Sequence, residues 1–263
     1  MTFTDALAKI STIADTTKVS LDEFGDGIKK IASDTGFATD DIAAAVYQAL
    51  SAAVDTSDAL EFTAGAADLA RAGFLDMFGS VDVLTTILNA YHKDVSEVSH
   101  ISDVLVKVQD RGKTTVNELA AAMGNVIPTA AQYGISLEDL GAAYVVLTKQ
   151  GINTARATTY LRSAFTELEK DGSDASVALK EATGKTFVQL LANGKSLGEI
   201  MQILKDYAHG DEEEFIHLFG SIRTAAGALA LANTSSEEYA EILDDVGNSS
   251  GQAARNVEKL QTP

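Results

Sequence analysis

The stretch "GISLEDLGAA", residues Gly134–Ala143, carries the signals that decide the fold. Its glycine can adopt the left-handed conformation that closes a helix without strain. Two residues later, Ser136 can accept a hydrogen bond from the free amides at the start of the next helix. Glu138 and Asp139 then lie in the first turn, where the helix dipole favours acidic side chains. The stretch therefore predicts a break between helices, followed by a new helix capped by Ser136.

The same order of residue types occurs elsewhere in the chain. "VSLDEFG" (Val19–Gly25) matches "ISLEDLG" (Ile135–Gly141) class for class. An internal duplication and convergence on the same capping chemistry would each explain the match, and we favour convergence.

Between such breaks, apolar residues recur at a spacing of 3.6, which is typical of amphipathic helices with one buried face. Five of these apolar stripes are Val81, Leu84, Ile87, Leu88 and Tyr91; Val98, Ile101, Leu105 and Val108; Leu161, Ala164, Phe165 and Leu168; Leu197, Ile200, Met201 and Leu204; and Tyr239, Ile242, Leu243 and Val246. Strand alternation is scarce, and no low-complexity linker marks a boundary. We therefore expect an all-α fold, a compact globule of short helices over residues 1–263 treated as one region.

Composition excludes several classes of function. The chain has no cysteine, so disulfides and thiolate metal sites are absent. Its 38 acidic and 20 basic residues give a net charge of −18, which repels nucleic acid and anionic membranes. The longest charge-free window, Leu119–Leu137, contains Asn125, Pro128 and Gln132 and is too polar to cross a bilayer. We expect no specific nucleic-acid binding and no membrane span.

Three Gly-Lys-Ser/Thr triplets resemble the end of a phosphate-binding loop: one within "GKTT" at Gly112–Thr115, one at Gly184–Thr186 and one at Gly194–Ser196. Such a loop also needs a glycine five residues before the first glycine of the triplet, so that backbone amides can surround the phosphates. Those positions hold Lys107, Leu179 and Gln189. The triplets therefore do not indicate nucleotide binding.

A capping interpretation fits the triplets better. Each Ser or Thr is followed three residues later by Glu or Gln, which is the pattern of a capping box. The pairs are Thr115 with Glu118, Thr186 with Gln189, and Ser196 with Glu199. For the middle triplet one alternative stays open, because "TFVQLLANG" also resembles an extended arm before an Asn-Gly turn. A short hairpin near residues 186–196 is that alternative.

Two Glu-x-x-His pairs, Glu97–His100 and Glu214–His217, have the spacing found in carboxylate-bridged di-metal sites of helical bundles. Glu61 and Glu167 are conceivable further donors. Each pair also fits a solvated first turn of a helix, and we favour surface histidines over a metal site. We assign no catalytic, metal or cofactor-binding residue, and the di-metal enzyme is the alternative hypothesis.

The charge-free window predicts a structural corner. Pro128 lacks an amide hydrogen and disfavours helix at Ile127, so we expect it to end the helix that holds Leu119 and Met123. We expect Asn125, Pro128 and Tyr133 to organise this corner and Thr115, Glu118 and Ser136 to act as caps. Runs of small residues, such as Ala120–Ala122 and Ala225–Ala232, indicate either close packing of helices within the chain or a self-association surface.

The segment Ile101–Phe165 closely resembles the core of phage tail tape measure proteins. The matching motifs are "ISDVL", "TTVNELA", "VIPTAAQYGIS", "LTKQGI" and "ATTYLR" within that segment, "AADLARAGF" and "VDVLTTILNAY" before it, and "NGKSLGEIMQIL" and "LFGSIRTAAGALAL" after it. The resemblance extends from about residue 20 to about residue 235.

This resemblance implies a structural protein of a phage tail or tail-like particle and not an enzyme. It implies a scaffold inside the tail tube that is made in the bacterial cytoplasm, sets tail length and leaves ahead of the DNA. The implied partners are the tail tube protein, tail assembly chaperones, tail-tip or baseplate hub proteins, and further copies of the chain as a trimer or hexamer.

Length limits what this segment can do by itself. A continuous helix of 263 residues would reach about 395 Å. The capping signals instead predict short helices and a radius of gyration of about 18 Å. We therefore expect these residues to form a folded core region of a longer polypeptide, or of a short tape measure in a small particle.

Overall fold

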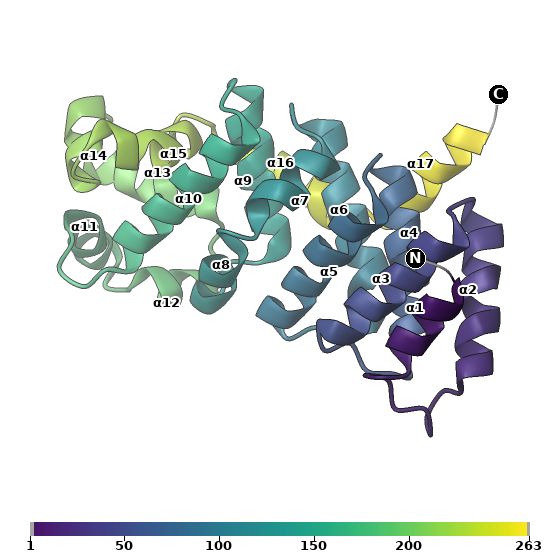
Figure 1. The fold of residues 1–263 in the computed structure, drawn as a ribbon. Coiled ribbons are helices and arrows are strands. Elements are labelled where there is room, and N and C mark those ends of the chain that lie inside the picture. The colour runs from purple at the N-terminus through teal and green to yellow at the C-terminus, as the bar shows by residue number, and fades with distance from the viewer. Residues whose placement is uncertain (1–2, 262–263) are drawn as a thin grey trace. The chain divides into compact units, whose positions relative to one another are not determined.

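The computed structural model describes residues 3–261 (Figure 1). Within them the chain forms seventeen α-helices and one short 3₁₀ helix and contains no strand, so the all-α prediction is confirmed. The chain divides into two compact units, one made of Met1–Val106 with Gly251–Pro263 and the other of Lys107–Ser250. We refer to them as unit 1 and unit 2.

Unit 1 is built around helices α3 and α4. Helix α3 packs against α1, α4 and α5, and α4 also packs against α2 and α17 (Figure 1). The elements of unit 1 are α1 (Phe3–Ile10), α2 (Leu21–Thr35), α3 (Thr39–Ser51), α4 (Ala59–Ala72), α5 (Met77–Tyr91), the 3₁₀ helix (Val95–Glu97), the first part of α6 (Val98–Arg111) and α17 (Gln252–Gln261).

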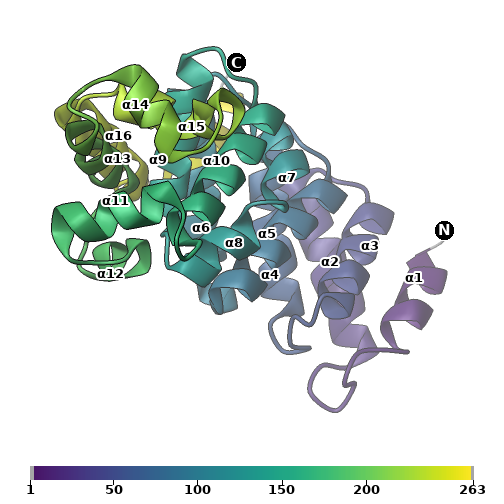
Figure 2. The same cartoon turned by 90° about the vertical axis from the view of Figure 1, so that its left-hand side faces the viewer.

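Unit 2 is built around helix α10, which packs against helices α7, α8, α9, α11, α12 and α15 (Figure 2). Its elements are α7 (Val116–Met123), α8 (Ile127–Tyr133), α9 (Leu137–Lys149), α10 (Thr154–Glu169), α11 (Asp174–Thr183), α12 (Phe187–Ala192), α13 (Leu197–Tyr207), α14 (Glu212–Leu218), α15 (Ile222–Ala232) and α16 (Ser236–Gly247). The last turn of α6 leads into this unit.

The three Gly-Lys-Ser/Thr triplets lie at the breaks between consecutive helices. Thr115, Thr186 and Ser196 are the N-caps of α7, α12 and α13, and each forms a complete capping box with the Glu or Gln three residues later. In the box of α13, the Ser196 amide donates to Glu199 at 2.9 Å and the Glu199 amide donates to Ser196 Oγ at 3.2 Å. Both partners thereby satisfy amides that a helix start leaves free.

The hairpin considered for residues 186–196 does not form, and that alternative was wrong. Residues Phe187–Ala192 are helix α12, and Phe187 and Leu190 are buried at helical spacing. The capping box of Thr186 starts a helix here, and the Asn193-Gly194 pair ends it, with Gly194 in the left-handed conformation at φ +82°. The amide of Lys195 donates to the Leu190 carbonyl at 3.1 Å, which closes the helix end.

The predicted apolar stripes supply part of the helical core. Every member of the stripes in α6, α10 and α13 is buried, and the stripes in α5 and α16 are buried except for Tyr91 and Leu243, which are half-buried. The small residues of α15 pack within the chain. A Cβ added at Gly227 would lie 3.0 Å from Tyr160 Cβ and 3.1 Å from the Tyr160 carbonyl carbon on α10. Close intramolecular packing is therefore the role of this alanine- and glycine-rich helix.

Candidate functional site: a groove along helix α10

The predicted caps and corner residues lie on three consecutive helices of unit 2. Thr115 starts α7, where its amide donates to Glu118 Oε2 at 2.9 Å and its hydroxyl accepts from the Glu118 amide at 3.1 Å. Ser136 starts α9, where its hydroxyl accepts from the Asp139 amide at 3.1 Å.

Pro128 has a different place from the one that the sequence predicted. Helix α7 already ends at Met123, and Pro128 lies in the first turn of the next helix, α8. A missing amide hydrogen matters little there, because the first amides of a helix have no intrahelical acceptor. The chain changes direction in the short turn that contains Asn125, and the Val126 amide closes this turn by donating to the Met123 carbonyl at 2.9 Å.

Tyr133 closes the other end of α8. Its ring packs edge-on against Phe187 of α12 with centroids 6.3 Å apart, and Phe187 stacks on Phe165 of α10 at 6.4 Å. The structure thus joins Tyr133 to an aromatic cluster that holds three helices together. Asn125, in contrast, is exposed and faces a groove.

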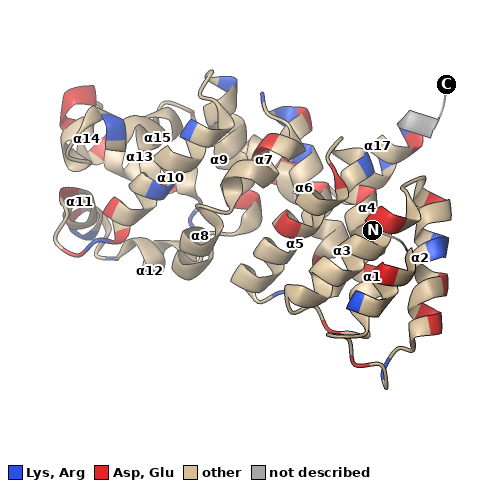
Figure 3. Ribbon diagram, viewed as in Figure 1, with Lys and Arg blue, Asp and Glu red and all other residues tan. Residues whose placement is uncertain are grey.

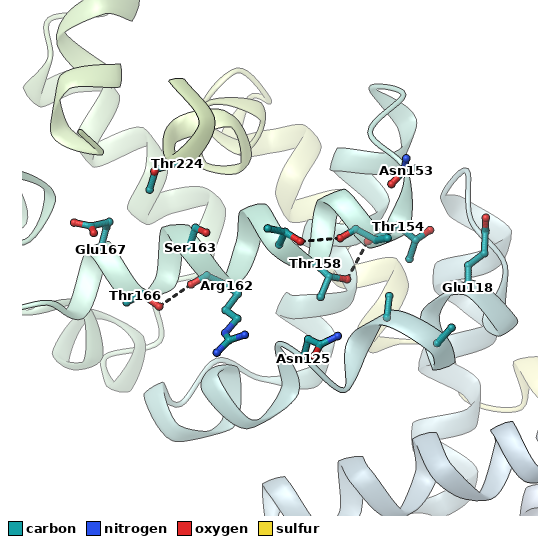
Figure 4. Close-up of a pocket in the computed structure, with 14 residues that line it drawn as sticks. Glu118, Asn125, Asn153, Thr154, Thr158, Arg162, Ser163, Thr166, Glu167 and Thr224 are labelled. Carbon is teal, nitrogen blue, oxygen red and sulfur yellow. Dashed lines mark hydrogen bonds between the residues drawn. The ribbon is translucent and has the colours of Figure 1, made fainter. Parts of the chain in front are cut away.

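The groove has a volume of about 940 Å³ and follows α10 (Figure 4). One wall is the end of α7 with Glu118, Ala121 and Ala122, and Thr224 of α15 lies at the far end. The groove is rich in hydroxyl groups because α10 presents threonine and serine along it. These hydroxyl residues are Thr154, Thr158, Thr159, Ser163 and Thr166.

Most of these hydroxyls already have partners. Thr154 Oγ1 lies 2.6 Å from Thr114 Oγ1, and Thr158 Oγ1 lies 2.5 Å from Tyr144 Oη. Thr166 Oγ1 donates to the Arg162 carbonyl at 2.8 Å. The lining also contains the carboxylates of Glu118 and Glu167, and Thr114 Oγ1 donates to Glu118 Oε2 at 3.4 Å.

A buried carboxylate lies at a second position in unit 2. The Asp139 side chain accepts from Tyr239 Oη at 2.6 Å and from the Leu197 amide at 2.8 Å, so it joins α9 to α13 and α16. Burial raises the pKa of the Asp139 carboxyl to about 6, although these two hydrogen bonds oppose the rise. The sequence placed Asp139 only in the first turn of a helix. No local signal identifies Tyr239, which is 100 residues away.

Unit 1 contains a comparable carboxylate, Asp103 of α6. Its two oxygens accept from the Gly251 amide at 2.6 Å, just before α17, and from the Ala253 amide at 2.8 Å, in the first turn of α17. Asp103 is 4% exposed, so the chain's return to unit 1 is fixed by a buried cap. The sequence analysis did not identify this residue either.

The di-metal alternative receives no support. Glu97 and His100 belong to unit 1, whereas Glu214 and His217 belong to unit 2 and are exposed. Glu97 instead pairs with Lys93 at 3.1 Å. Glu61 is exposed, and Glu167 lines the groove. Over residues 3–261, no cluster of three or more His, Cys, Asp or Glu side chains is placed to hold a metal ion.

The described residues thus form an all-α chain with two buried carboxylates at helix starts and a hydroxyl-rich groove along α10. In the described part of the chain, no helix is both long enough and apolar enough to cross a membrane. The chain belongs to the family of phage-related minor tail proteins, whose family model matches residues 25–247.

Two curated relatives are similar along almost the whole chain. The probable tape measure protein of Clostridium phage phiCD119 is 36% identical over 247 residues, which are 90% of this chain and 26% of that protein. The tape measure protein of Pneumococcus phage Dp-1 is 24% identical over 264 residues, 98% of this chain and 23% of that protein. The chain thus spans about a quarter of the length of these relatives. No solved structure matches it.

Proposed function

We propose that this chain is the folded core region of a tape measure protein in the tail of a phage or a tail-like particle. In this role it scaffolds assembly of the tail tube, takes part in setting tail length and is released ahead of the DNA. The observation that carries the proposal is the 36% identity to a probable tape measure protein over 90% of the chain.

Residues 1–263, with their two compact units, form part of a longer polypeptide in this proposal. Its longest helix, α10, has 16 residues and so spans only about 24 Å. Length measurement therefore belongs to other parts of the polypeptide, and the role of this region is to hold partners. We propose structural roles for six residues at the ends of α7, α8 and α9, namely Thr115, Glu118, Asn125, Pro128, Tyr133 and Ser136. Of these, Glu118 and Asn125 line the groove.

The proposed location is the interior of the tail tube. The proposed partners are the tail tube protein, tail assembly chaperones, tail-tip or baseplate hub proteins, and other copies of the chain in a trimer or hexamer. A net charge of −18 supports this location, because a strongly acidic surface does not retain the DNA that later passes through the tube. The proposal includes no catalytic activity.

An in-frame deletion tests the role. Phages whose gene lacks the codons for residues 25–247 should form no tails or tails of uncontrolled length when particles are viewed by electron microscopy. The intact gene supplied in trans should restore tails of one length. Tails of normal number and length from the deletion strain would refute the proposal.

A further inference from the structure

The end of α4 contains an aromatic residue in an unfavourable backbone conformation. Phe74 has φ +55°, in the left-handed region that normally holds glycine at a helix end. The Leu75 amide donates to the Ala70 carbonyl at 3.0 Å, so the helix end is closed in the usual manner with phenylalanine in the glycine position. This conformation costs about 1 kcal/mol or more for a residue with a Cβ. The Phe74 side chain is 70% exposed, so packing within the chain does not offset that cost.

A second phenylalanine lies four residues later. Phe78, in the first turn of α5, is also 70% exposed. The Gln48 side chain of α3 holds its backbone by donating to the Phe78 carbonyl at 3.3 Å. Phe78 lines a hollow of about 320 Å³ between α3 and α5, together with Phe37, Ala44 and Met77. A large apolar side chain from another molecule would fit against this wall.

The charges around the hollow are of one sign. Its lining includes the carboxylates of Asp41 and Asp76 and no lysine or arginine. Asp76 uses one oxygen to cap α5, accepting from the Gly79 amide at 2.7 Å. Helix α5 itself carries a single charged residue, Asp82, and most of this helix is tan in Figure 3, the colour of residues other than Lys, Arg, Asp and Glu. A partner that fills the hollow therefore meets an aromatic surface with an acidic rim.

We propose that the hollow lined by Phe78, together with exposed Phe74 in the turn just before α5, binds a segment of another protein that presents a large apolar side chain beside lysine or arginine. Exposed aromatic side chains with little freedom are typical anchors of protein interfaces, and charges of opposite sign at the rim give specificity. A strained residue that adds nothing to the fold is a signal of function at that position. The proposal goes beyond the tape measure role and does not depend on it.

Two other occupants fit less well. A second copy of this chain docked through the same surface would bring both copies of Asp41 and Asp76 together, and like charges at an interface are repulsive. An anionic membrane surface is repelled for the same reason. Both occupants become outcomes of the experiment.

The experiment titrates the complete chain against three synthetic helical peptides at about 150 mM salt, with fluorescence anisotropy as the readout. The first peptide carries leucine on one face and lysine beside it. The second has glutamate in place of lysine, and the third has serine in place of leucine.

Three variants of the chain and one control complete the experiment. The variants are Phe74→Gly, Phe78→Ala and the double variant Asp41→Asn/Asp76→Asn, in which the asparagine introduced beside α5 can still cap that helix. Ile222→Ala is the matched control, because Ile222 is an equally exposed apolar residue (72%) in unit 2.

We expect the leucine–lysine peptide to bind the natural chain and to bind each phenylalanine variant about tenfold more weakly. The carboxylate variant should also bind more weakly, and Ile222→Ala should bind as the natural chain does. The glutamate and serine peptides should not bind. Phe74→Gly should unfold at an equal or higher temperature, because glycine relieves the backbone strain.

Several results would overturn the proposal. Unchanged binding by the phenylalanine variants, or equal binding of the serine peptide, would show that the interaction is only electrostatic. A dimer detected by sedimentation and lost in Phe78→Ala would make a second copy the occupant. Vesicle binding lost in Phe78→Ala would make a lipid surface the occupant. A clear fall in the melting temperature of Phe74→Gly would assign Phe74 to the fold itself.

Discussion

At the scale of single residues, Asp139 is a buried carboxylate whose pKa lies well above its ordinary value. Its protonated form fits the observed geometry without loss of a hydrogen bond. The Oδ1 hydroxyl of the protonated carboxyl would donate to Tyr239 Oη, and Tyr239 Oη donates in turn to the Asp139 carbonyl at 3.1 Å. Oδ2 still accepts from the Leu197 amide at 2.8 Å. Because burial raises the pKa in the folded state to about 6 from an ordinary value of 3.8, the folded chain holds this proton more tightly than the unfolded chain does.

This difference in pKa sets the direction of the pH effect. The contribution of Asp139 to stability is fully present below about pH 4 and is lost as the pH rises through about 6. The difference between the two pKa values corresponds to a change in the free energy of unfolding on the order of 3 kcal/mol. In Asp139→Asn, the amide nitrogen can take the place of the donor and the amide oxygen can accept from Leu197, so the titration disappears without loss of contacts.

We therefore expect Asp139→Asn to match the natural chain in stability near pH 4 and to exceed it near pH 7. Urea unfolding at a series of pH values measures the difference between the two chains, which removes the effect of other titrating groups. A difference that stays constant from pH 4 to pH 7 would contradict the protonation of Asp139.

At the scale of elements, the crossing of α10 and α15 depends on Gly227. A Cβ added at Gly227 would lie 3.1 Å from the Tyr160 carbonyl carbon. Backbone atoms cannot move aside as the end of a flexible side chain can. Gly227→Ala should therefore lower the free energy of unfolding by about 1–3 kcal/mol. Gly247→Ala is the control, because a Cβ there meets nothing within 4 Å; it should be neutral or stabilise by up to about 1 kcal/mol. Equal melting temperatures for the two variants would show that α10 and α15 do not approach so closely.

The docking of α17 depends on Asp103. Asp103→Ala removes the acceptor of two backbone amides, and the loss of a helix cap costs about 1–2 kcal/mol. We expect amide hydrogen exchange in α17 to become about tenfold faster, with unit 2 unaffected. Asp26→Ala is a suitable control, because the Asp26 side chain is 84% exposed and has only a weak contact with Lys29 at 3.5 Å. Unchanged exchange in α17 would mean that its apolar contacts with α4 are sufficient to hold it.

Local sequence signals predicted most of the helices. Helix starts could be read from Ser and Thr caps, and buried faces from apolar spacing, because both depend on neighbours within four residues. The position of Pro128 was misjudged, since a proline that ends one helix and a proline that begins the next give the same local pattern. The hairpin alternative for α12 arose because six residues are too few for periodicity to separate a strand from a helix.

At the scale of the whole molecule, the division into two units was beyond the reach of the sequence pattern. Unit 1 is discontinuous, and residues 251–261 join it through a contact between Asp103 and amides 148 and 150 positions away. A contact between residues so far apart leaves no periodic pattern in the sequence. The groove was equally hidden, because Thr154, Thr158 and Thr166 look like ordinary helix residues until α7 and α15 are placed beside α10.

The charge of the whole chain leads to a prediction about DNA. Duplex DNA is retained by proteins whose lysine and arginine side chains release its counterions, and this chain has an excess of 18 negative charges. We expect no retention of a 30-base-pair duplex in a gel-shift or anisotropy titration, even at about 50 mM salt, where electrostatic attraction is strongest. A duplex-binding protein of similar size provides the positive control. A dissociation constant below about 10 μM that weakens steeply with added salt would reveal a basic surface strong enough to overcome the net charge, and a protein with such a surface would impede DNA passing along a tail tube.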